Sequence, residues 1–552
     1  MNARFLLVPI RLVTLLAIAF LACSHSLCVR AAQRAQSEKT SEAKFYRVAG
    51  TIVNAVSGEP LGRARVALAD NKNPEHVMRL ITSDDGHFEF RGLTTGKFSL
   101  QGAKRGFVPA AYEQHEQFST AIVTGVGIDT ENLRLKLTPL AFLSGKVLDE
   151  SGEPIRSADV ILYRKFTNNG WTRTQRVSQD GTDDQGYFEF PAMPPGDYFV
   201  SASGTPWYAV SKMISNTASQ PSFVPQGLDV TYPSTYYNGV ADSESATSIP
   251  VKAGDRLRID LHLSPVPSLH LIFHTKELQG FPTPTFQKQV FDTVESVSVA
   301  GSSVQPGVWE VTGVPPGRYT VVSSEPGGQR SSYLSLNESG ELDLSGGEAS
   351  AQVVLRVKLP QDEPPPEQLL FALRDSRRRF TANYAPNASG TVTIPNVAPG
   401  KYSVIAGSPV KPYSVMRMTS PGGKISGREL EVTANASLDL TVYLASGIVS
   451  VEGVVKRGDQ PASGIMVALV PKDPEAHIEL FRRDQSDLDG SFILRGIIPG
   501  AYTIIAVEDA WGFPWLEKGV LARYVLKGQN VNVTGNMKRS VYLPEPLQVQ
   551  SR

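Results

Sequence analysis

The chain has 552 residues, enough for several domains at roughly 100–200 residues per domain. Its 54 basic and 54 acidic side chains give a formal net charge of zero, so it lacks the basic field with which proteins neutralise nucleic-acid phosphates. Hydrophobic residues make up 41%, which excludes a disordered chain, and two cysteines are too few for a disulfide-stapled scaffold or a thiolate zinc cluster.

The first 31 residues have the pattern of a secretory signal peptide. Arg4 and Arg11 precede an apolar run from Leu12 to Ala22, which is too short to span a bilayer. We expect cleavage after Ala31, followed by a polar linker at residues 32–44. The pattern predicts export, to the periplasm, the outer surface or the medium.

Lipidation at Cys23 is the alternative reading of the same segment. The run from Phe20 to Cys23 resembles a bacterial lipobox, although Phe20 and Leu21 are poor residues for that motif. No later segment approaches eighteen consecutive apolar residues, so we expect no transmembrane segment in the mature chain.

A thirteen-residue pattern recurs five times along the chain. In the second copy Phe188 and Phe190 are two residues apart, so both point to one face of a strand and Glu189 points to water. A glycine turn precedes each strand and a second tight turn follows it. We expect Phe188, Phe190, Tyr198, Val160 and Leu162 to be buried and Glu189 to be exposed. The copies are Gly86–Phe98, Gly186–Tyr198, Gly307–Tyr319, Gly390–Tyr402 and Gly490–Tyr502.

Copies one, two and five also share an opening before this pattern, G-x-[IV] followed by a turn at Ser57–Pro60, Ser151–Pro154 and Gly458–Pro461. Alternating runs are read as closing strands: Leu133–Leu137, Leu257–Leu263, Val353–Leu359 and Leu438–Leu444. One helix is predicted from Pro514 to Tyr524, where Leu516, Val520 and Tyr524 share a helical face.

These patterns predict an all-β fold: a tandem array of about five antiparallel β-sandwiches after the signal peptide. Copies three and four lack the shared opening, so we expect degenerate sandwiches there. The predicted sandwiches span residues 45–138, 139–264, 265–360, 361–445 and 446–548.

The repeated unit resembles the carboxypeptidase regulatory-like domain, a transthyretin-like (prealbumin-like) seven-stranded sandwich. The resemblance rests on G-x-V, S-G-E-P-[LI], [TS]-x-x-[DQ]-G-x-F and P-P-G-x-Y; it is partial in copies three and four. The stretch Tyr232–Gly239 also resembles a tyrosine-rich insert of tandem secreted bacterial members. The family is named for its place beside a zinc peptidase domain, and the resemblance implies a non-catalytic module. The fold also resembles carbohydrate-binding sandwiches, which suggests glycan binding by analogy alone.

Two segments superficially match metal motifs. His274 and Glu277 match H-x-x-E, half of a zinc peptidase site, but the sequence offers no third ligand beside them and no separate domain to hold such a site. The run Gln485–Gly490 superficially matches a calcium loop, yet its first and twelfth positions are Gln485 and Gly496. We read both as structural, and predict no metal, no cofactor and no catalytic residue.

Aromatic residues outside the repeat pattern are the candidate binding residues. Aromatic faces stack on apolar faces of sugars or on proline-rich peptides. The alternative is that these side chains cover sheet ends or pack between domains. The candidates are Trp207, Tyr208, Tyr236, Tyr237, Trp511, Phe513 and Trp515.

The sequence therefore predicts an exported, non-catalytic, multidomain protein of the binding or adhesion type. Its expected partner is a polysaccharide or another cell-envelope polymer, not nucleic acid. The alternative is a ligand-free spacer or scaffold at the cell surface. A zinc carboxypeptidase-like hydrolase is disfavoured, because the metal site is incomplete.

Overall fold

The computed structural model describes residues 45–552, except 126, 210–227, 275–282, 326–327, 361–362, 378, 422–424, 427, 448, 475–476, 535–536 and 538–539. The predicted signal peptide (1–31), the linker (32–44), Cys23 and Glu277 lie outside the described residues. No helix within the described part is long and apolar enough to cross a membrane.

The described strands pair into ten sheets, which form five two-sheet sandwiches, each with its own hydrophobic core. The first contains β1 (Tyr46–Asn54), β2 (Arg65–Asp70), β3 (Val77–Ile81), β4 (His87–Leu93), β5 (Gly96–Ala103), β6 (Phe107–Val108), β7 (Ala110–Ala111), β8 (Ile122–Thr124) and β9 (Leu133–Pro139). The second contains β10 (Ala141–Leu148), β11 (Asp159–Asn168), β12 (Trp171–Gly181), β13 (Tyr187–Met193), β14 (Gly196–Gly204), β15 (Val230–Tyr236), the 3₁₀ turn η1 (Ser243–Ser245), β16 (Ile249–Val251), β17 (Arg256–Arg258), β18 (Leu261–His262) and β19 (Val266–Pro267).

The third and fourth sandwiches follow directly. The third contains β20 (Leu269–His274), β21 (Thr285–Val290), β22 (Thr293–Val297), β23 (Ala300–Gln305), β24 (Val308–Val314), β25 (Gly317–Glu325), β26 (Gly328–Leu336), β27 (Gly340–Glu341) and β28 (Glu348–Ala349). The fourth contains β29 (Ala351–Lys358), β30 (Leu370–Asp375), β31 (Thr391–Val397), β32 (Gly400–Gly407), β33 (Tyr413–Thr419), β34 (Ile425–Ser426), β35 (Glu429–Val432) and β36 (Ser437–Ser446).

The fifth sandwich carries the α-helix that the structure describes. It contains β37 (Val449–Arg457), β38 (Gln460–Pro461), β39 (Met466–Pro471), η3 (Ile478–Leu480), β40 (Arg482–Gln485), β41 (Ser491–Ile497), β42 (Gly500–Val507), α3 (Ala522–Val525), β43 (Gln529–Val533), β44 (Val541–Tyr542) and β45 (Leu547–Gln548). The predicted helix from Pro514 to Tyr524 is wrong in extent: residues 514–521 form turns and only 522–525 are helical. A longer helix is not needed to bury the apolar side chains of this segment, because the turns already place Trp515 and Leu521 in a core.

Every sandwich uses its opening strand in the same way. In the first, Gly50 of β1 lies opposite Phe88 of antiparallel β4 and opposite Leu133 of parallel β9. The corresponding parallel pairs are β10 with β17 and β18, β20 with β27, β29 with β36, and β37 with β44 and β45. Pairing between the other named strands of the five sandwiches is antiparallel.

The repeated pattern has a direct structural cause. In copies two to five its tyrosine hydroxyl donates a hydrogen bond to the backbone carbonyl four residues earlier, as Tyr198 does to Pro194 at 2.6 Å and Tyr502 does to Ile498 at 2.6 Å. Its first glycine has a positive φ, +70° at Gly186, and a Cβ there would lie 2.7 Å from the carbonyl oxygen of Val147. Glycine is required because a side chain would both strain the turn and strike the opening strand.

The predicted register of the second sandwich is confirmed. Phe188, Phe190 and Tyr198 are at most 2% exposed, and Glu189 is exposed. Val160 and Leu162 are buried in the same core. A one-residue slip would have inverted every face of the strand, so the pattern of alternation identified the core side correctly.

The boundary predicted between residues 360 and 361 is wrong. The run Val353–Leu359, predicted to close the third sandwich, belongs to β29 and opens the fourth: Val353 pairs with Ile394 and Leu355 pairs with Leu440. The third sandwich closes instead on β27, after which Leu342 donates its backbone N–H to Ile272. Alternation of apolar and polar residues indicates a half-buried strand, but it does not predict with which of two neighbouring sheets the strand pairs.

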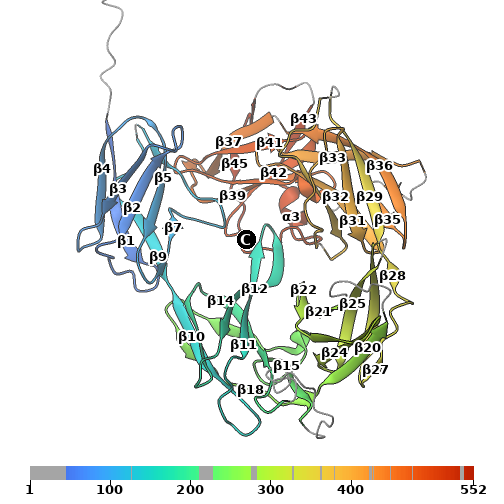
Figure 1. Cartoon of the computed structure of the whole chain (residues 1–552). Helices are drawn as coiled ribbons and strands as arrows, with labels where there is room; N and C mark the ends of the chain where they lie inside the picture. The colour runs from blue at the N-terminus through green and yellow to red at the C-terminus, as the bar shows by residue number, and fades with distance from the viewer. Residues whose placement is uncertain are drawn as a thin grey trace, which may run out of the picture.

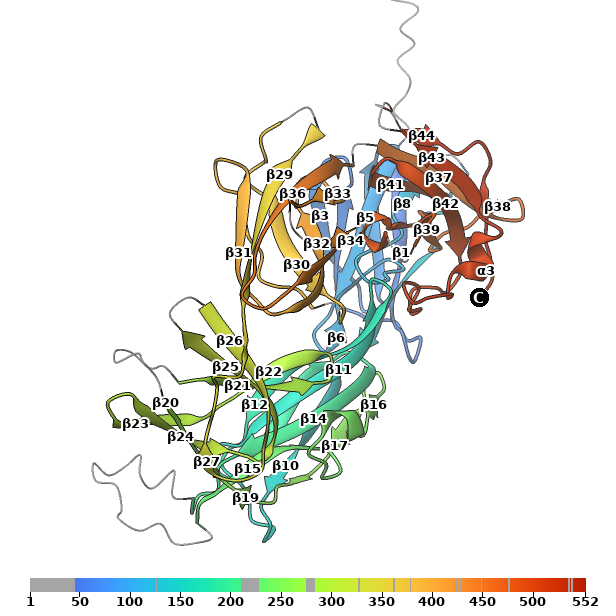
Figure 2. The ribbon, with the colours of Figure 1, turned by 90° about the vertical axis from the view of Figure 1, so that its right-hand side faces the viewer.

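The five sandwiches follow one another around a ring, so that the first lies beside the fifth (Figure 1). The ring is not flat: the second and third sandwiches lie on one side of the other three (Figure 2). The long β11–β12 hairpin of the second sandwich points from its own sheet toward the fifth sandwich (Figure 1). This hairpin and the contact between the first and fifth sandwiches position the candidate site.

Candidate functional site at the ring closure

A buried ion pair joins the first and fifth sandwiches. Arg483, at the start of β40, donates two hydrogen bonds to the Glu116 carboxylate, at 2.7 and 3.2 Å. The side chains of Arg483 and Glu116 are only 4% and 11% exposed. These residues are 367 positions apart in the chain, so the pair holds the two ends of the ring together.

Polar contacts extend this junction on both sides of the ion pair. The side-chain amide of Gln485 donates to the backbone carbonyl of Glu113 at 2.7 Å and to the Thr120 hydroxyl at 2.8 Å. The Asp487 carboxylate accepts the Ala121 backbone N–H at 3.0 Å and the Lys97 ammonium at 2.5 Å. The run that superficially matches a calcium loop, Gln485–Gly490, therefore directs two of its polar side chains to groups of the first sandwich.

Aromatic rings close the junction beside these polar contacts. Trp511 stacks on His115 of the first sandwich, with ring centroids 5.2 Å apart and planes 7° apart. The Arg483 guanidinium lies 4.5 Å above the Trp515 ring and 5.3 Å above Phe118. Cation–π contacts of a desolvated arginine add to the ion pair.

The tip of the β11–β12 hairpin reaches the same place from the second sandwich. Asn169 and Gly170 both have positive φ, 50° and 74°, as a two-residue Asn-Gly hairpin turn requires. The side-chain amide oxygen of Asn169 accepts a hydrogen bond from Arg483 at 2.8 Å, and the Asn169 backbone N–H donates to Glu116 at 3.2 Å. Three sandwiches thus meet at Arg483.

The structure places the seven predicted aromatic candidates in different surroundings. Trp511 and Trp515 are 6% and 4% exposed and pack at the junction, so no sugar ring can stack on them in this arrangement. Tyr236 is 2% exposed and packs between the second and third sandwiches, against Phe291 at 5.7 Å. These three residues therefore pack between domains, which was the alternative to a binding role.

The remaining four candidates are more accessible. Tyr237 is partly buried on the core of the second sandwich, and Phe513 lies under the Arg552 guanidinium at 4.5 Å. Trp207 is 74% exposed and stands edge-on to Tyr208. The Tyr208 hydroxyl donates to Glu150 at 2.6 Å, which holds the pair in place. Trp207 and Tyr208 therefore remain available as a binding surface.

An open cleft of about 1190 Å³ lies between the first and fifth sandwiches, beside the junction. Tyr542 of β44, at 70% exposure, is an aromatic side chain in its lining. Among the other lining residues are Lys72, Lys97, Asp487, Arg495 and Glu545, so the cleft contains both cationic and anionic groups. The sequence reading missed Tyr542, because it lies in a two-residue strand with no pattern around it.

The carboxylates of the cleft are partly desolvated by the junction. Burial raises the pKa of Asp484 to about 6, although its carboxylate accepts the Ile493 backbone N–H at 2.8 Å. Burial also raises the pKa of Asp487, against the opposing effect of Lys97. The ionised form of Asp484 therefore costs folding free energy above pH 6.

We expect Asp484→Asn to stabilise the protein above pH 6 and to have little effect near pH 4. A raised pKa means that the folded state holds its proton more tightly, so stability falls as pH rises from about 4 to about 6. A shift of about two units corresponds to a gain of up to about 3 kcal/mol at neutral pH. Urea unfolding at pH 4 and pH 7 measures the difference in free energy of unfolding between the variant and the parent protein. Asp180→Asn is the control, since Asp180 accepts the Glu189 N–H at 2.8 Å at the corresponding place in the second sandwich. An equal pH slope in D484N and the parent protein would contradict the assignment.

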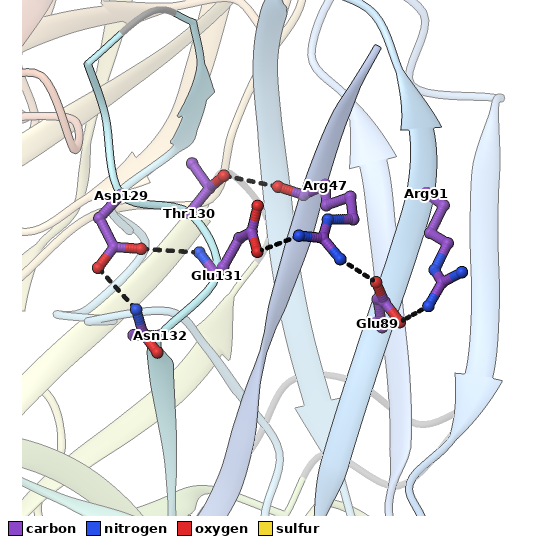
Figure 3. Close-up of polar contacts among 7 residues, drawn as sticks. All are labelled: Arg47, Glu89, Arg91, Asp129, Thr130, Glu131 and Asn132. Carbon is purple, nitrogen blue, oxygen red and sulfur yellow. Dashed lines mark hydrogen bonds and ion pairs between the residues drawn. The ribbon is translucent and has the colours of Figure 1, made fainter.

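Two other clusters of charged side chains lie outside the cleft. His270 bonds Glu310 and Asp229, each at 2.7 Å; burial opposes its protonation, but these carboxylates raise its pKa above the usual value. On the first sandwich, Arg47 and Arg91 form ion pairs with Glu89, and Arg47 also reaches Glu131 at 2.7 Å (Figure 3). Exposed pairs of this kind contribute little stability.

The zinc-like motif is not assembled with further ligands in the part of the chain that the structure describes. His274 lies 3.1 Å from Glu341, and both side chains are more than half exposed. No group of three or more His, Cys, Asp or Glu is placed to hold a metal ion among the described residues. Glu277, the second residue of the motif, is outside them.

Comparison with solved structures finds matches of low sequence identity that superpose poorly on this chain. The Bacillus anthracis TIE protein has 12% identity over 76% of this chain and 78% of its own, with a TM-score of 0.16. The minor pilin GBS52 of Streptococcus agalactiae has 12% identity over 43% and 100%, with a TM-score of 0.21. The Bacillus cereus major pilin subunit BcpA has 11% identity over 73% and 99%, with a TM-score of 0.15. These scores carry no argument about this chain.

Comparison with known sequences identifies the domain type. No curated protein is significantly similar to the chain. Residues 47–135 and 143–264, which cover the first two sandwiches, match the family "Carboxypeptidase regulatory-like domain". The matched ranges include the opening strands, the glycine turns and the closing strands described above. The first two sandwiches thus carry the sequence pattern of carboxypeptidase regulatory-like domains.

Proposed function

We propose that the protein is an exported, non-catalytic scaffold that binds a cell-envelope polymer, with a polysaccharide as the favoured class. Support for a non-catalytic role comes from the domain type, which is a non-catalytic module. Support for binding comes from one observation: closure of the ring forms a cleft of about 1190 Å³ with an exposed tyrosine in its lining.

The cleft has the chemistry that a sugar chain requires. The Tyr542 ring offers a face for stacking, and Asn71, Ser99 and Glu452 offer hydrogen-bonding groups elsewhere in the lining of the same cleft. The cleft is open rather than enclosed, which suits a segment of a polymer better than a small molecule. Trp207 with Tyr208 is a second candidate surface on another sandwich.

Co-sedimentation of the purified protein with insoluble polysaccharides and with peptidoglycan tests this proposal. We expect Tyr542→Ala to weaken retention at least tenfold, because base or sugar stacking on one aromatic side chain contributes about 1–3 kcal/mol. Tyr333→Ala is the matched control, since Tyr333 is 75% exposed on the third sandwich and does not line the cleft.

The outcome also separates the candidate surfaces. Loss of retention in Trp207→Ala with normal retention in Tyr542→Ala would move the site to the second sandwich. Absence of retention on every polymer would contradict the proposal and favour a ligand-free spacer.

A further inference from the structure

A small cavity lies at the junction of the fourth and fifth sandwiches, away from the ring-closure cleft. Its volume is about 30 Å³, and the residues that line it include Arg374, Ser403, Tyr413, Ser414, Arg428 and Glu479. Arg374 and Ser403 face each other on the paired strands β30 and β32. A cavity of this size holds about two water molecules, or the two oxygens of one anionic group.

Cationic side chains outnumber carboxylates around this cavity. Arg428 is paired with Glu479, and their side chains are 16% and 21% exposed. The Glu479 carboxylate also accepts the Ser414 hydroxyl at 3.4 Å and lies 3.9 Å from His477. The Glu479 carboxylate therefore already has Arg428 and Ser414 as partners and is not a dedicated counter-charge for Arg374.

Arg374 has no carboxylate of its own within the described part of the chain. Its backbone pairs with Ser403, but its side chain forms no hydrogen bond or ion pair with any described residue. The charge that acts on it is that of Arg173 in the β11–β12 hairpin. Burial, and then repulsion from Arg173, lower the pKa of Arg374. The Arg374 guanidinium is thus partly desolvated without a counter-charge among the described residues.

Neighbouring groups show the same excess of positive charge. Burial lowers the pKa of Arg428, and burial together with the Arg428 charge lowers the pKa of His477, although Asp473 acts in the opposite direction. The Nδ1 atom of His477 is buried and has no hydrogen-bond partner among the described residues. Arg482 donates only to backbone carbonyls, of Glu479, Phe481 and Gly496.

We propose that this cavity is an oxyanion site, in which Arg374 binds the carboxylate or phosphate group of an anionic ligand. The planar guanidinium fork matches two oxygens of such a group, and the Ser403 hydroxyl on the opposite strand is a second donor. An anion there would supply the negative charge that Arg374 lacks. This site does not depend on the ring-closure cleft or on the function proposed for it.

Thermal unfolding of the full protein in sodium phosphate, sodium acetate and sodium chloride at equal ionic strength tests the proposal. We expect phosphate, acetate or both to raise the melting temperature above that in chloride, and the anion that acts identifies the group. Arg374→Gln should bind that anion at least tenfold more weakly. In chloride alone it should melt at the same or a higher temperature, because a desolvated cation has been removed.

Two further variants make the result decisive. Arg356→Gln, which removes an exposed arginine paired with Asp439 on the other sheet of the same sandwich, should keep the full anion effect. Arg374→Lys keeps the charge but loses the fork, so it should retain part of the effect even if Arg374→Gln does not fold. Equal anion effects in Arg374→Gln and the parent protein would indicate an adventitious ion only. Absence of any anion effect in the parent protein would also overturn the proposal.

Discussion

Replacement of Arg483 by alanine is expected to open the ring between the first and fifth sandwiches. The change leaves Glu116 buried without its partner and removes the guanidinium from the Trp515 and Phe118 rings. Breaking a buried ion pair by deleting one partner typically costs about 3–5 kcal/mol. Small-angle X-ray scattering should show a larger radius of gyration, because the ring then opens at its closing contact.

The control for this variant is Arg356→Ala, which breaks an ion pair whose side chains are 59% and 46% exposed. An exposed pair contributes at most about 1 kcal/mol, so this variant should leave both stability and scattering nearly unchanged. A double-mutant cycle with Glu116→Gln isolates the pair from the effects of each deletion. Unchanged scattering of Arg483→Ala would show that the other junction contacts hold the ring closed without it.

Substitution of Gly170 by alanine is expected to detach the β11–β12 hairpin from the fifth sandwich. A Cβ at Gly170 would lie 2.5 Å from the Trp515 indole, and its φ of +74° disfavours any side chain. The left-handed conformation costs about 1–2 kcal/mol for an alanine, and forced overpacking typically adds about 1–3 kcal/mol. Trp515 would then become more accessible, which iodide quenching of tryptophan fluorescence measures.

Gly152→Ala separates strain from contact. Gly152 has a φ of +82° in the turn of the second sandwich, and a Cβ there would meet no atom within 4 Å. It should therefore show the cost of the backbone conformation alone, without a change in quenching. Equal melting temperatures and equal quenching in the two variants would contradict the predicted clash between a side chain at position 170 and the Trp515 indole.

The repeat pattern predicted the individual sandwiches well, because their cores depend on neighbours close in the sequence. The alternation of Phe188, Glu189 and Phe190 identified the buried face, and the glycine before them identified the turn. The boundary between the third and fourth sandwiches could not be predicted from the same pattern. The strand from Val353 to Leu359 alternates in the same way whether it closes one sandwich or opens the next, and only its pairing with Ile394 and Leu440 decides.

The candidate sites, by contrast, depend on which sandwiches meet in space. Trp511 and Trp515 are large aromatic residues outside the repeat, a pattern equally typical of an exposed platform and of a domain contact. Their burial is decided by His115, Phe118 and the hairpin tip at Gly170, which come from the first and second sandwiches.

The sequence by itself determined the strand faces, the turns, the repeated unit and the family of the first two sandwiches, since these follow from local spacing and backbone conformation. The tertiary structure alone decided the closure of the ring, the cleft beside Tyr542 and the unpaired arginine at the fourth and fifth sandwiches. The physical reason is that burial and charge neutralisation depend on partners hundreds of residues away, and no local pattern records which partner a side chain will meet.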